Sequence, residues 1–324
     1  MKFGAIDIGT GSVLCLAVEQ AEDGQLQELI NESVITSLGT GTLSEKRVGQ
    51  EAQQRTLSAV VSYVGKLQAE GVEHISVVGT SALRRASNRR EFVERVRQET
   101  GVEVEVISGE DEARLTFWGA TSGLDWAGPV VVMDVGGGSS ELVLGHCSKG
   151  QSDGLQEPAL FFSVPIGSLV LTERFITGYP VSPGELRNLT AGIREEFRNE
   201  TVQRIVQESR RFADRPLLVG VGGSATTLVA MEWAIHPYVA SLVQGREVHA
   251  ATASKHIERL AAMSLEERHE VVGLPKGRAP VIDAGLSILL CLLGEFGSDS
   301  MTVSDRGLRY GVVVRDICMA NRMH

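Results

Sequence analysis

At 324 residues the chain is too long for one ordinary hydrophobic core, so we expect two domains. Its hydrophobic content of 43% and charged content of 22% are typical of a globular protein. The net charge of −10 argues against general nucleic-acid binding, and it would also repel an anionic substrate. Any such substrate therefore needs a local basic surface.

The spacing of cysteines and histidines argues against disulfides and zinc. The four cysteines are scattered, with no CxxC motif and no nearby pair of histidines. The seven histidines show no spacing typical of metal ligands, and we expect His249 and His256 at the surface. Met1 and Lys2 lead directly into a predicted strand, so no signal peptide is expected. The longest apolar stretch, 284–294, is too short for a membrane span, so we predict a soluble cytoplasmic protein.

The first part of the chain alternates strand and helix patterns. Gly71 is expected to end the first helix, and Asn88 and Ser108 are expected as N-caps of the next two. This order predicts a mixed sheet flanked by helices. The predicted elements are strands at 3–8, 13–19 and 27–35, a helix at 50–70, a strand at 74–80, a helix at 88–98, a strand at 102–107 and a helix at 108–119.

A polar, glycine-rich stretch at 122–128 is the predicted domain boundary, because the order of elements restarts after it. The repetition predicts an α/β domain at 1–127 and a second at 128–307, with a last helix at 308–324 that packs back onto the first. The later predicted elements are strands at 130–134, 141–145 and 160–164, helices at 169–175 and 183–197, a strand at 216–221, a helix after the Gly-Gly-Ser-Ala-Thr-Thr segment at 222–227, a mainly helical stretch at 251–296, a strand at 301–304 and a helix at 308–319.

Two predicted strands each end in an aspartate followed by a glycine-rich turn and hydroxyl residues. Residues 5–12 read Ala-Ile-Asp-Ile-Gly-Thr-Gly-Ser, and residues 132–141 read Val-Met-Asp-Val-Gly-Gly-Gly-Ser-Ser-Glu. A strand–turn–strand hairpin of this kind can lay backbone N–H groups against phosphate oxygens. Glycine turns are common in hairpins, so one alone would say little. Two indicate duplicated halves that grip one phosphate from both sides.

An arginine-rich segment could supply the basic surface. Residues 84–97 hold six arginines against two glutamates. Arginine suits phosphate because its planar fork donates two parallel hydrogen bonds. A solvated helix face with salt bridges is the alternative interpretation for Arg89, Arg90, Arg95 and Arg97.

Seven segments of the chain together carry a family resemblance. In order they are 5–12, Gly-Thr-Ser-Ala-Leu-Arg at 79–84, Ile-Ser-Gly-Glu-Asp-Glu-Ala-Arg at 107–114, 134–141, Ser-Val-Pro-Ile-Gly at 163–167, Gly-Val-Gly-Gly-Ser-Ala-Thr-Thr at 220–227 and Val-Ser-Asp-Arg-Gly-Leu-Arg at 303–309. With these segments the chain resembles the exopolyphosphatase/guanosine pentaphosphate phosphohydrolase (Ppx/GppA) family, which belongs to the actin, sugar kinase and Hsp70 fold group. The resemblance covers nearly the whole chain, and it implies an α/β fold of two actin-like (ribonuclease H-like) domains with the site in a cleft between them.

Hydrolysis of a phosphoanhydride requires a grip on the terminal phosphoryl group, charge neutralisation and an aligned water. Asp7, Asp134 and Glu141 can hold Mg²⁺ or Mn²⁺ as hard oxygen ligands, although an aspartate at a strand end also serves simply to stabilise a turn. The residues expected to bind substrate phosphate are Gly9, Thr10, Gly11, Ser12, Arg84, Gly136, Gly137, Gly138, Ser139, Ser140, Gly222, Gly223 and Ser224.

The general base is expected among three consecutive acids, Glu110, Asp111 and Glu112. With Ser108 as N-cap, Asp111 takes the N3 position and has a structural role, while Glu110 lies in the first turn. By resemblance, Glu112 matches the family's catalytic glutamate, because it directly precedes Ala-Arg; a non-catalytic helix-start acid is the alternative. Arg84 likewise matches a family arginine that contacts substrate phosphate, and a salt bridge is its alternative.

The chain departs from the family pattern at four positions. Gly11 stands where asparagine is usual, Leu14 where arginine is common, Arg85 where an acid is usual, and Tyr310 where an acid is usual. The catalytic set is intact, but these departures leave substrate preference open. The chain also resembles the short, two-domain form without the C-terminal helical domains that longer members use to bind long chains and dimerise. Processivity and a homodimer therefore stay open.

The expected activity is metal-dependent removal of the terminal phosphate of inorganic polyphosphate, with guanosine pentaphosphate as the alternative substrate of the same chemistry. An ATP-dependent kinase or chaperone-like ATPase is a second class, but the Ser-Ala-Thr-Thr that follows Gly223 suits phosphate better than an adenosine pocket. A non-catalytic sensor of guanosine penta- or tetraphosphate is a third class. Retention of Glu112, Asp134 and Glu141 argues against that sensor.

Overall fold

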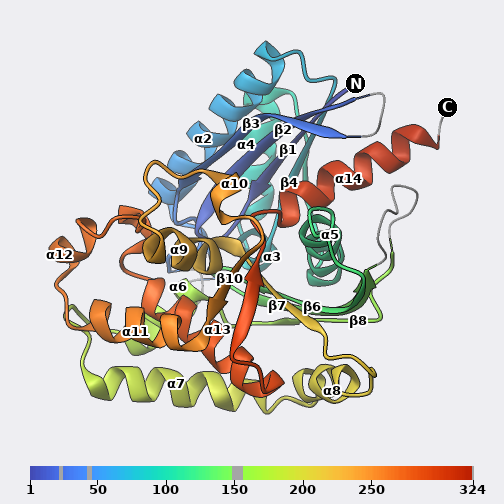
Figure 1. The fold of residues 1–324 in the computed structure, drawn as a ribbon. Helices are drawn as coiled ribbons and strands as arrows, with labels where there is room; N and C mark the ends of the chain where they lie inside the picture. The colour runs from blue at the N-terminus through green and yellow to red at the C-terminus, as the bar shows by residue number, and fades with distance from the viewer. Residues whose placement is uncertain (22–24, 42–45, 148–155, 323–324) are drawn as a thin grey trace. The chain divides into compact units, whose positions relative to one another are not determined.

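The computed structural model describes residues 1–21, 25–41, 46–147 and 156–322 (Figure 1). The chain divides into two units. Unit 1 is formed by Met1–Ser122 together with the C-terminal segment from Leu308, and unit 2 lies between Gly123 and Gly307. No helix within the described ranges is both long and apolar enough to cross a membrane.

Unit 1 contains a five-stranded mixed sheet of order β3-β2-β1-β4-β5. The central strand β1 pairs antiparallel with β2 and parallel with β4. The outer pairs are β2 with β3, antiparallel, and β4 with β5, parallel. The strands are β1 (Lys2–Ile8), β2 (Ser12–Gln20), β3 (Leu26–Ile35), β4 (His74–Gly79) and β5 (Val104–Val106).

Alternate residues of β1 face two different helical layers. Ile6 and Ile8 lie in a core cluster with residues of α2 and α4, whereas Phe3 and Ala5 lie in a cluster with residues of α5 and α14. Because strand side chains alternate between faces, Asp7 falls on the face that α5 and α14 cover. The helices are α2 (Gln50–Ala69), α3 (Ser81–Arg85), α4 (Arg89–Thr100), α5 (Gly109–Thr121) and α14 (Leu308–Asn321), and α14 contacts α5 (Figure 1).

Unit 2 repeats this strand order. Its sheet runs β10-β11-β9-β6-β7-β8. Strands β6, β7 and β8 form an antiparallel meander, and β9 pairs in parallel with both β6 and β11. Strand β10 adds an antiparallel edge. The strands are β6 (Gly128–Val135), β7 (Ser140–Cys147), β8 (Leu160–Val164), β9 (Leu217–Val221), β10 (Arg246–His249) and β11 (Ser300–Val303). Two mixed sheets of one order, each flanked by helices, confirm the predicted fold class.

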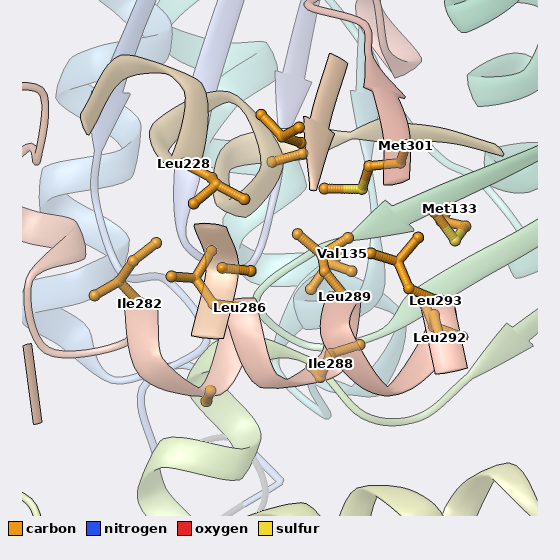
Figure 2. Close-up of a cluster of buried hydrophobic side chains, with 14 of the residues drawn as sticks. Met133, Val135, Leu228, Ile282, Leu286, Ile288, Leu289, Leu292, Leu293 and Met301 are labelled. Carbon is orange, nitrogen blue, oxygen red and sulfur yellow. The ribbon is translucent and has the colours of Figure 1, made fainter. Parts of the chain in front are cut away.

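The helix α13 forms the centre of the unit 2 core. Its buried positions Ile282, Leu286, Leu289 and Leu293 recur at helical spacing and face Leu228 and strand residues such as Met133 and Met301 (Figure 2). The remaining helices of this unit are α6 (Ser168–Phe175), α7 (Pro183–Phe197), α8 (Glu200–Ser209), α9 (Gly222–Glu232), α10 (Ala240–Val243), α11 (Ala250–Ala261) and α12 (Leu265–His269), with a 3₁₀ turn η1 at Lys276–Arg278; α13 spans Ile282–Phe296.

Local capping is partly as predicted. The Ser108 hydroxyl accepts the Asp111 N–H at 3.0 Å and so caps α5. Gly71 has a φ of +74° just after the end of α2, where left-handed backbone favours glycine. Asn88 occupies the N-cap position of α4 as predicted, but the cap bond expected from its side chain is absent. Instead its amide pairs with both backbone groups of Val48 at 3.0 Å.

His256 is also not at the surface. It is 5% exposed, and its Nε2 lies 2.9 Å from a carboxylate oxygen of Glu232. His249 is exposed, as expected. Among the described residues, four elements lie outside the sequence predictions: α3, α8, α10 and β10. The α8 signal was readable, because the Asn199 side chain caps it and valine and isoleucine positions recur at helical spacing.

Candidate functional site

The first glycine turn joins β1 to β2 directly after Asp7. The Gly9 N–H donates to the Ser12 carbonyl at 2.9 Å, which closes the turn. The carbonyls of Thr10 and Gly11 accept bonds of 2.9–3.0 Å from the segment that follows β3. With the carbonyls fixed from one side, the turn has a defined orientation at the carboxyl end of β1.

The second glycine turn has the same construction. The Gly136 N–H donates to the Ser139 carbonyl at 3.0 Å. The carbonyls of Gly136 and Gly137 accept from the segment after β8, at 2.9 and 3.0 Å from Ser168 and Leu169. A side chain at Gly167 would overlap the backbone of Gly137, so this close approach requires glycine. The duplication predicted from sequence therefore extends to the hydrogen bonds of the turns.

A third glycine segment begins α9 at the carboxyl end of β9. Gly222 has a φ of +80°, and a Cβ there would lie 2.5 Å from Asp134 Oδ1. Strand β9 lies beside β6, with Val221 opposite Asp134. The Gly136 turn, Asp134 and the N-terminus of α9 therefore share one edge of the unit 2 sheet. A helix N-terminus presents unsatisfied N–H groups and suits an anion.

Arg278, which the sequence predictions do not include, lies directly over Gly223. Any side chain at Gly223 would overlap the Arg278 guanidinium. Arg278 ends the turn η1, just before α13. A basic residue in a short loop ahead of an apolar helix was the only local signal, and it does not specify the contact. The arginine adds a positive charge to the N-terminus of α9.

Two of the three predicted metal ligands are cross-strand neighbours. Asp134 on β6 is directly opposite Glu141 on β7, so both carboxylates are on one face of the sheet. Glu141 is 1% exposed and accepts a 2.7 Å bond from Ser163. Among the described residues, no group of three or more His, Cys, Asp or Glu side chains could hold a metal. The Asp134–Glu141 pair alone still fits Mg²⁺, which commonly takes one or two carboxylates and completes its shell with water and phosphate.

In unit 1, the predicted base and the predicted phosphate-binding arginine form an ion pair. Arg84 Nη1 lies 2.5 Å from Glu112 Oε2, and it also donates to the Ile107 carbonyl at 3.2 Å. Glu112 is 8% exposed. Burial raises its pKa above the usual carboxylate value of 4.5, and Arg84 opposes that rise as the main neighbouring charge. The salt-bridge alternative for Arg84 therefore holds in this state, and its partner is the predicted base.

These unit 1 groups share one edge of their sheet. Gly79, at the end of β4, is opposite Ile8 at the end of β1, and Arg84 follows on α3. Glu112 follows β5 on α5. Asp7, 7% exposed, is the residue before Ile8 on β1 and lies opposite Val78 of β4. The carboxyl ends of parallel strands are the usual position of ligand sites in open α/β sheets.

The other charged candidates pair locally. Glu110 and Asp111 both lie within 3.4 Å of Arg114 on their own helix. In the arginine-rich segment, Arg97 pairs with Glu94 at 2.7 Å and Arg95 bonds the Gln54 side chain at 3.0 Å. The solvated-face interpretation therefore applies to these two arginines.

A model of the Ppx/GppA phosphatase family matches residues 17–319. The chain belongs to this family. It is 30% identical over 326 residues to Exopolyphosphatase 2 of Mycobacterium tuberculosis, which covers 97% of this chain and 98% of the mycobacterial one. It is 31% identical over 314 residues to the guanosine-5'-triphosphate,3'-diphosphate pyrophosphatase of Vibrio parahaemolyticus, which covers 96% of this chain and 58% of the Vibrio protein.

Solved structures agree with the family assignment. The crystal structure of the Aquifex aeolicus Ppx/GppA family member is 33% identical and has a TM-score of 0.78, covering 99% of each chain. An exopolyphosphatase from Cytophaga hutchinsonii has a TM-score of 0.86 at 24% identity, covering 99% of this chain and 98% of its own. The second likeness supports the fold alone.

Proposed function

We propose that this protein is an exopolyphosphatase, which hydrolyses the terminal phosphoanhydride of inorganic polyphosphate and releases orthophosphate. The observation that carries the proposal is a buried carboxylate of raised pKa, Glu112, at the same sheet edge as a phosphate-type glycine turn. The choice of polyphosphate is supported by the mycobacterial relative, named as an exopolyphosphatase, whose length this chain matches almost completely.

Different residues of the proposed site bind phosphate, accept the proton and neutralise charge. The two glycine turns and the N-terminus of α9 hold phosphate oxygens through backbone N–H groups, and Arg84 and Arg278 add positive charge. Glu112 takes a proton from the attacking water, whose oxygen bonds to the terminal phosphorus while the bridging P–O bond breaks. The shortened chain leaves with the electron pair of that bond. A Mg²⁺ or Mn²⁺ held by Asp134 and Glu141 would neutralise phosphate charge. The role of Asp7 as a metal ligand stays a prediction from the sequence.

Substrate binding would increase the basicity of Glu112 by weakening its ion pair with Arg84. A polyphosphate end that draws Arg84 onto its own oxygens weakens the pair with Glu112. The carboxylate then loses a bond that lowers its pKa and becomes a stronger base. Substrate binding and base activation are therefore coupled in this proposal.

Guanosine pentaphosphate is the second candidate substrate, supported by the name of the Vibrio relative. This chain spans only 58% of that protein's length, which places this candidate behind polyphosphate. A cytoplasmic location and a homodimer stay predictions from the sequence.

The proposal is tested by orthophosphate release from long-chain polyphosphate, guanosine pentaphosphate and ATP in parallel, each with Mg²⁺ and with a chelator. We expect release from polyphosphate that requires the metal. Faster release from guanosine pentaphosphate would replace the substrate, and release from ATP alone would indicate an ATPase. Tight guanosine nucleotide binding without release from any of them would indicate the sensor.

Replacement of Gly223 by alanine is expected to raise the KM for polyphosphate about tenfold or more, with a small effect on unfolding temperature. The three atoms nearest to the new methyl group all belong to the flexible end of Arg278, which must leave the α9 N-terminus. Loss of a charge-assisted hydrogen bond costs about 1.5–3 kcal/mol. Steady-state kinetics check this expectation. The matched control is Gly294→Ala, also at a helical glycine of unit 2, where nothing lies within 4 Å of the added methyl group. An unchanged KM in Gly223→Ala would remove Arg278 from the site.

A further inference from the structure

A fully buried arginine lies beneath the segment that carries Arg278. Arg268, at the end of α12, is 0% exposed, and its guanidinium forms an ion pair with Asp283 on the first turn of α13. The same guanidinium donates to the carbonyls of Ala279 at 3.0 Å and Leu260 at 2.6 Å. The ring of Tyr179 lies 4.5 Å from it. A single side chain therefore connects four separate segments of unit 2.

Stability alone is a weak reason for such an arrangement. Desolvation of a buried ion pair offsets much of its attraction, and a well-packed apolar pair of similar volume is often as stable. The contacts of this pair are directional instead. The hydrogen bonds of a planar guanidinium fix both the angle and the distance of each carbonyl oxygen that accepts them. The observation to explain is therefore the geometry that this pair imposes.

That geometry centres on Arg278. Arg268 holds the carbonyl of Ala279, the next residue, and the Tyr179 hydroxyl donates to the carbonyl of Pro280, the residue after that. On the other side, the Arg278 N–H donates to the Pro275 carbonyl at 2.8 Å. Residues 275–277, which directly precede Arg278, are exposed. The Arg278 carbonyl accepts from the Val281 N–H at 2.9 Å. Arg268 and Tyr179 fix the two carbonyls that directly follow Arg278 in the chain.

We propose that Arg268, Asp283 and Tyr179 form a positioning clamp, which holds Arg278 over Gly223 so that its guanidinium meets substrate phosphate at the N-terminus of α9. This inference rests on the proposed function, because it assigns Arg278 to the phosphate site. The three clamp residues touch no substrate. They act through Arg278, and their loss reduces substrate affinity rather than the chemical step.

A double-mutant cycle separates this role from simple stabilisation. The clamp variants are Tyr179→Phe and Arg268→Lys. The first loses only the hydrogen bond to the Pro280 carbonyl, and the second keeps the positive charge but loses the planar guanidinium and its paired N–H donors. Each is made in the wild-type and in the Arg278→Ala background. We expect Tyr179→Phe and Arg268→Lys to raise the KM for polyphosphate about threefold and tenfold, with kcat within about twofold. In the Arg278→Ala background, neither should raise KM further. Equal KM increases in both backgrounds would overturn the proposal, because the clamp would then act independently of Arg278.

A second readout requires no substrate and separates this inference from the proposed function. The Nε–Hε NMR resonance of Arg278, identified by its loss in Arg278→Ala, reports the guanidinium directly. We expect Tyr179→Phe, the variant least disruptive to folding, to move this resonance towards the position of solvent-exposed arginines. An unchanged resonance would overturn the clamp even if polyphosphate is the substrate. A moved resonance in a protein that releases no orthophosphate would support the clamp and refute the proposed function.

Discussion

Glu112→Gln is expected to lower kcat for orthophosphate release by about 10²–10⁴-fold while the affinity for polyphosphate stays within about twofold. Glutamine has nearly the same shape and can still accept a bond from Arg84, so the local structure is retained, but it cannot take a proton from water. The measurement is kcat from steady-state kinetics beside Kd from a direct binding assay.

The matched control is Glu110→Gln, an exposed acid in the first turn of the same helix. Glu110 pairs with Arg114 on its own helix and has no proposed role in the reaction, so kcat should be unchanged. Near-normal turnover in Glu112→Gln would show that the base is a different residue. Equal losses in both variants would indicate damage to α5 rather than removal of a base.

Arg84→Ala is expected to raise the KM for polyphosphate by about 10–100-fold, since charge-assisted bonds to phosphate are worth about 1.5–3 kcal/mol. Arg90→Ala, at an exposed position on the neighbouring helix α4, is the control and should leave KM within about twofold. An unchanged KM in Arg84→Ala would limit Arg84 to the ion pair with Glu112.

The same Arg84→Ala variant should also move the pH profile of kcat/KM. Turnover requires ionised Glu112, so the rate falls as pH drops through the pKa of this carboxyl. Burial raises that pKa above 4.5 and Arg84 lowers it, so removal of Arg84 leaves burial less opposed and raises the pKa. The acid limb should therefore move to higher pH in the variant. A limb that moves to lower pH, or does not move, would contradict the assignment of Glu112 as the titrating base.

The elements of the site were predictable from sequence wherever the signal was local. Each glycine turn is encoded by consecutive residues, and the Ser108 cap could be predicted from its position three residues before Asp111. The repeated order of strands and helices likewise led to two sheets of one topology. These features depend on backbone preferences and hydrophobic periodicity, which are written along the chain.

The features that escaped prediction depend on contacts between distant segments. The Asn88 side chain accepts the backbone N–H of Val48, a distant residue of unit 1, and makes no cap bond to its own helix. His256 is buried because Glu232 of another helix lies beside it. Arg278 lies over Gly223, a residue of a different helix, and no local pattern records that contact. The tertiary fold, and not residue order, decides these three contacts.

In the proposed reaction, water attacks the terminal phosphorus of polyphosphate. This step is tested by hydrolysis in ¹⁸O-labelled water, with the label followed by mass spectrometry in orthophosphate and in the shortened chain. We expect one ¹⁸O in each orthophosphate released and none in the remaining chain, with the reaction lost in Glu112→Gln. Label in the shortened chain instead would show that water attacks a different phosphorus, and undiminished release by Glu112→Gln would show that Glu112 is not the base.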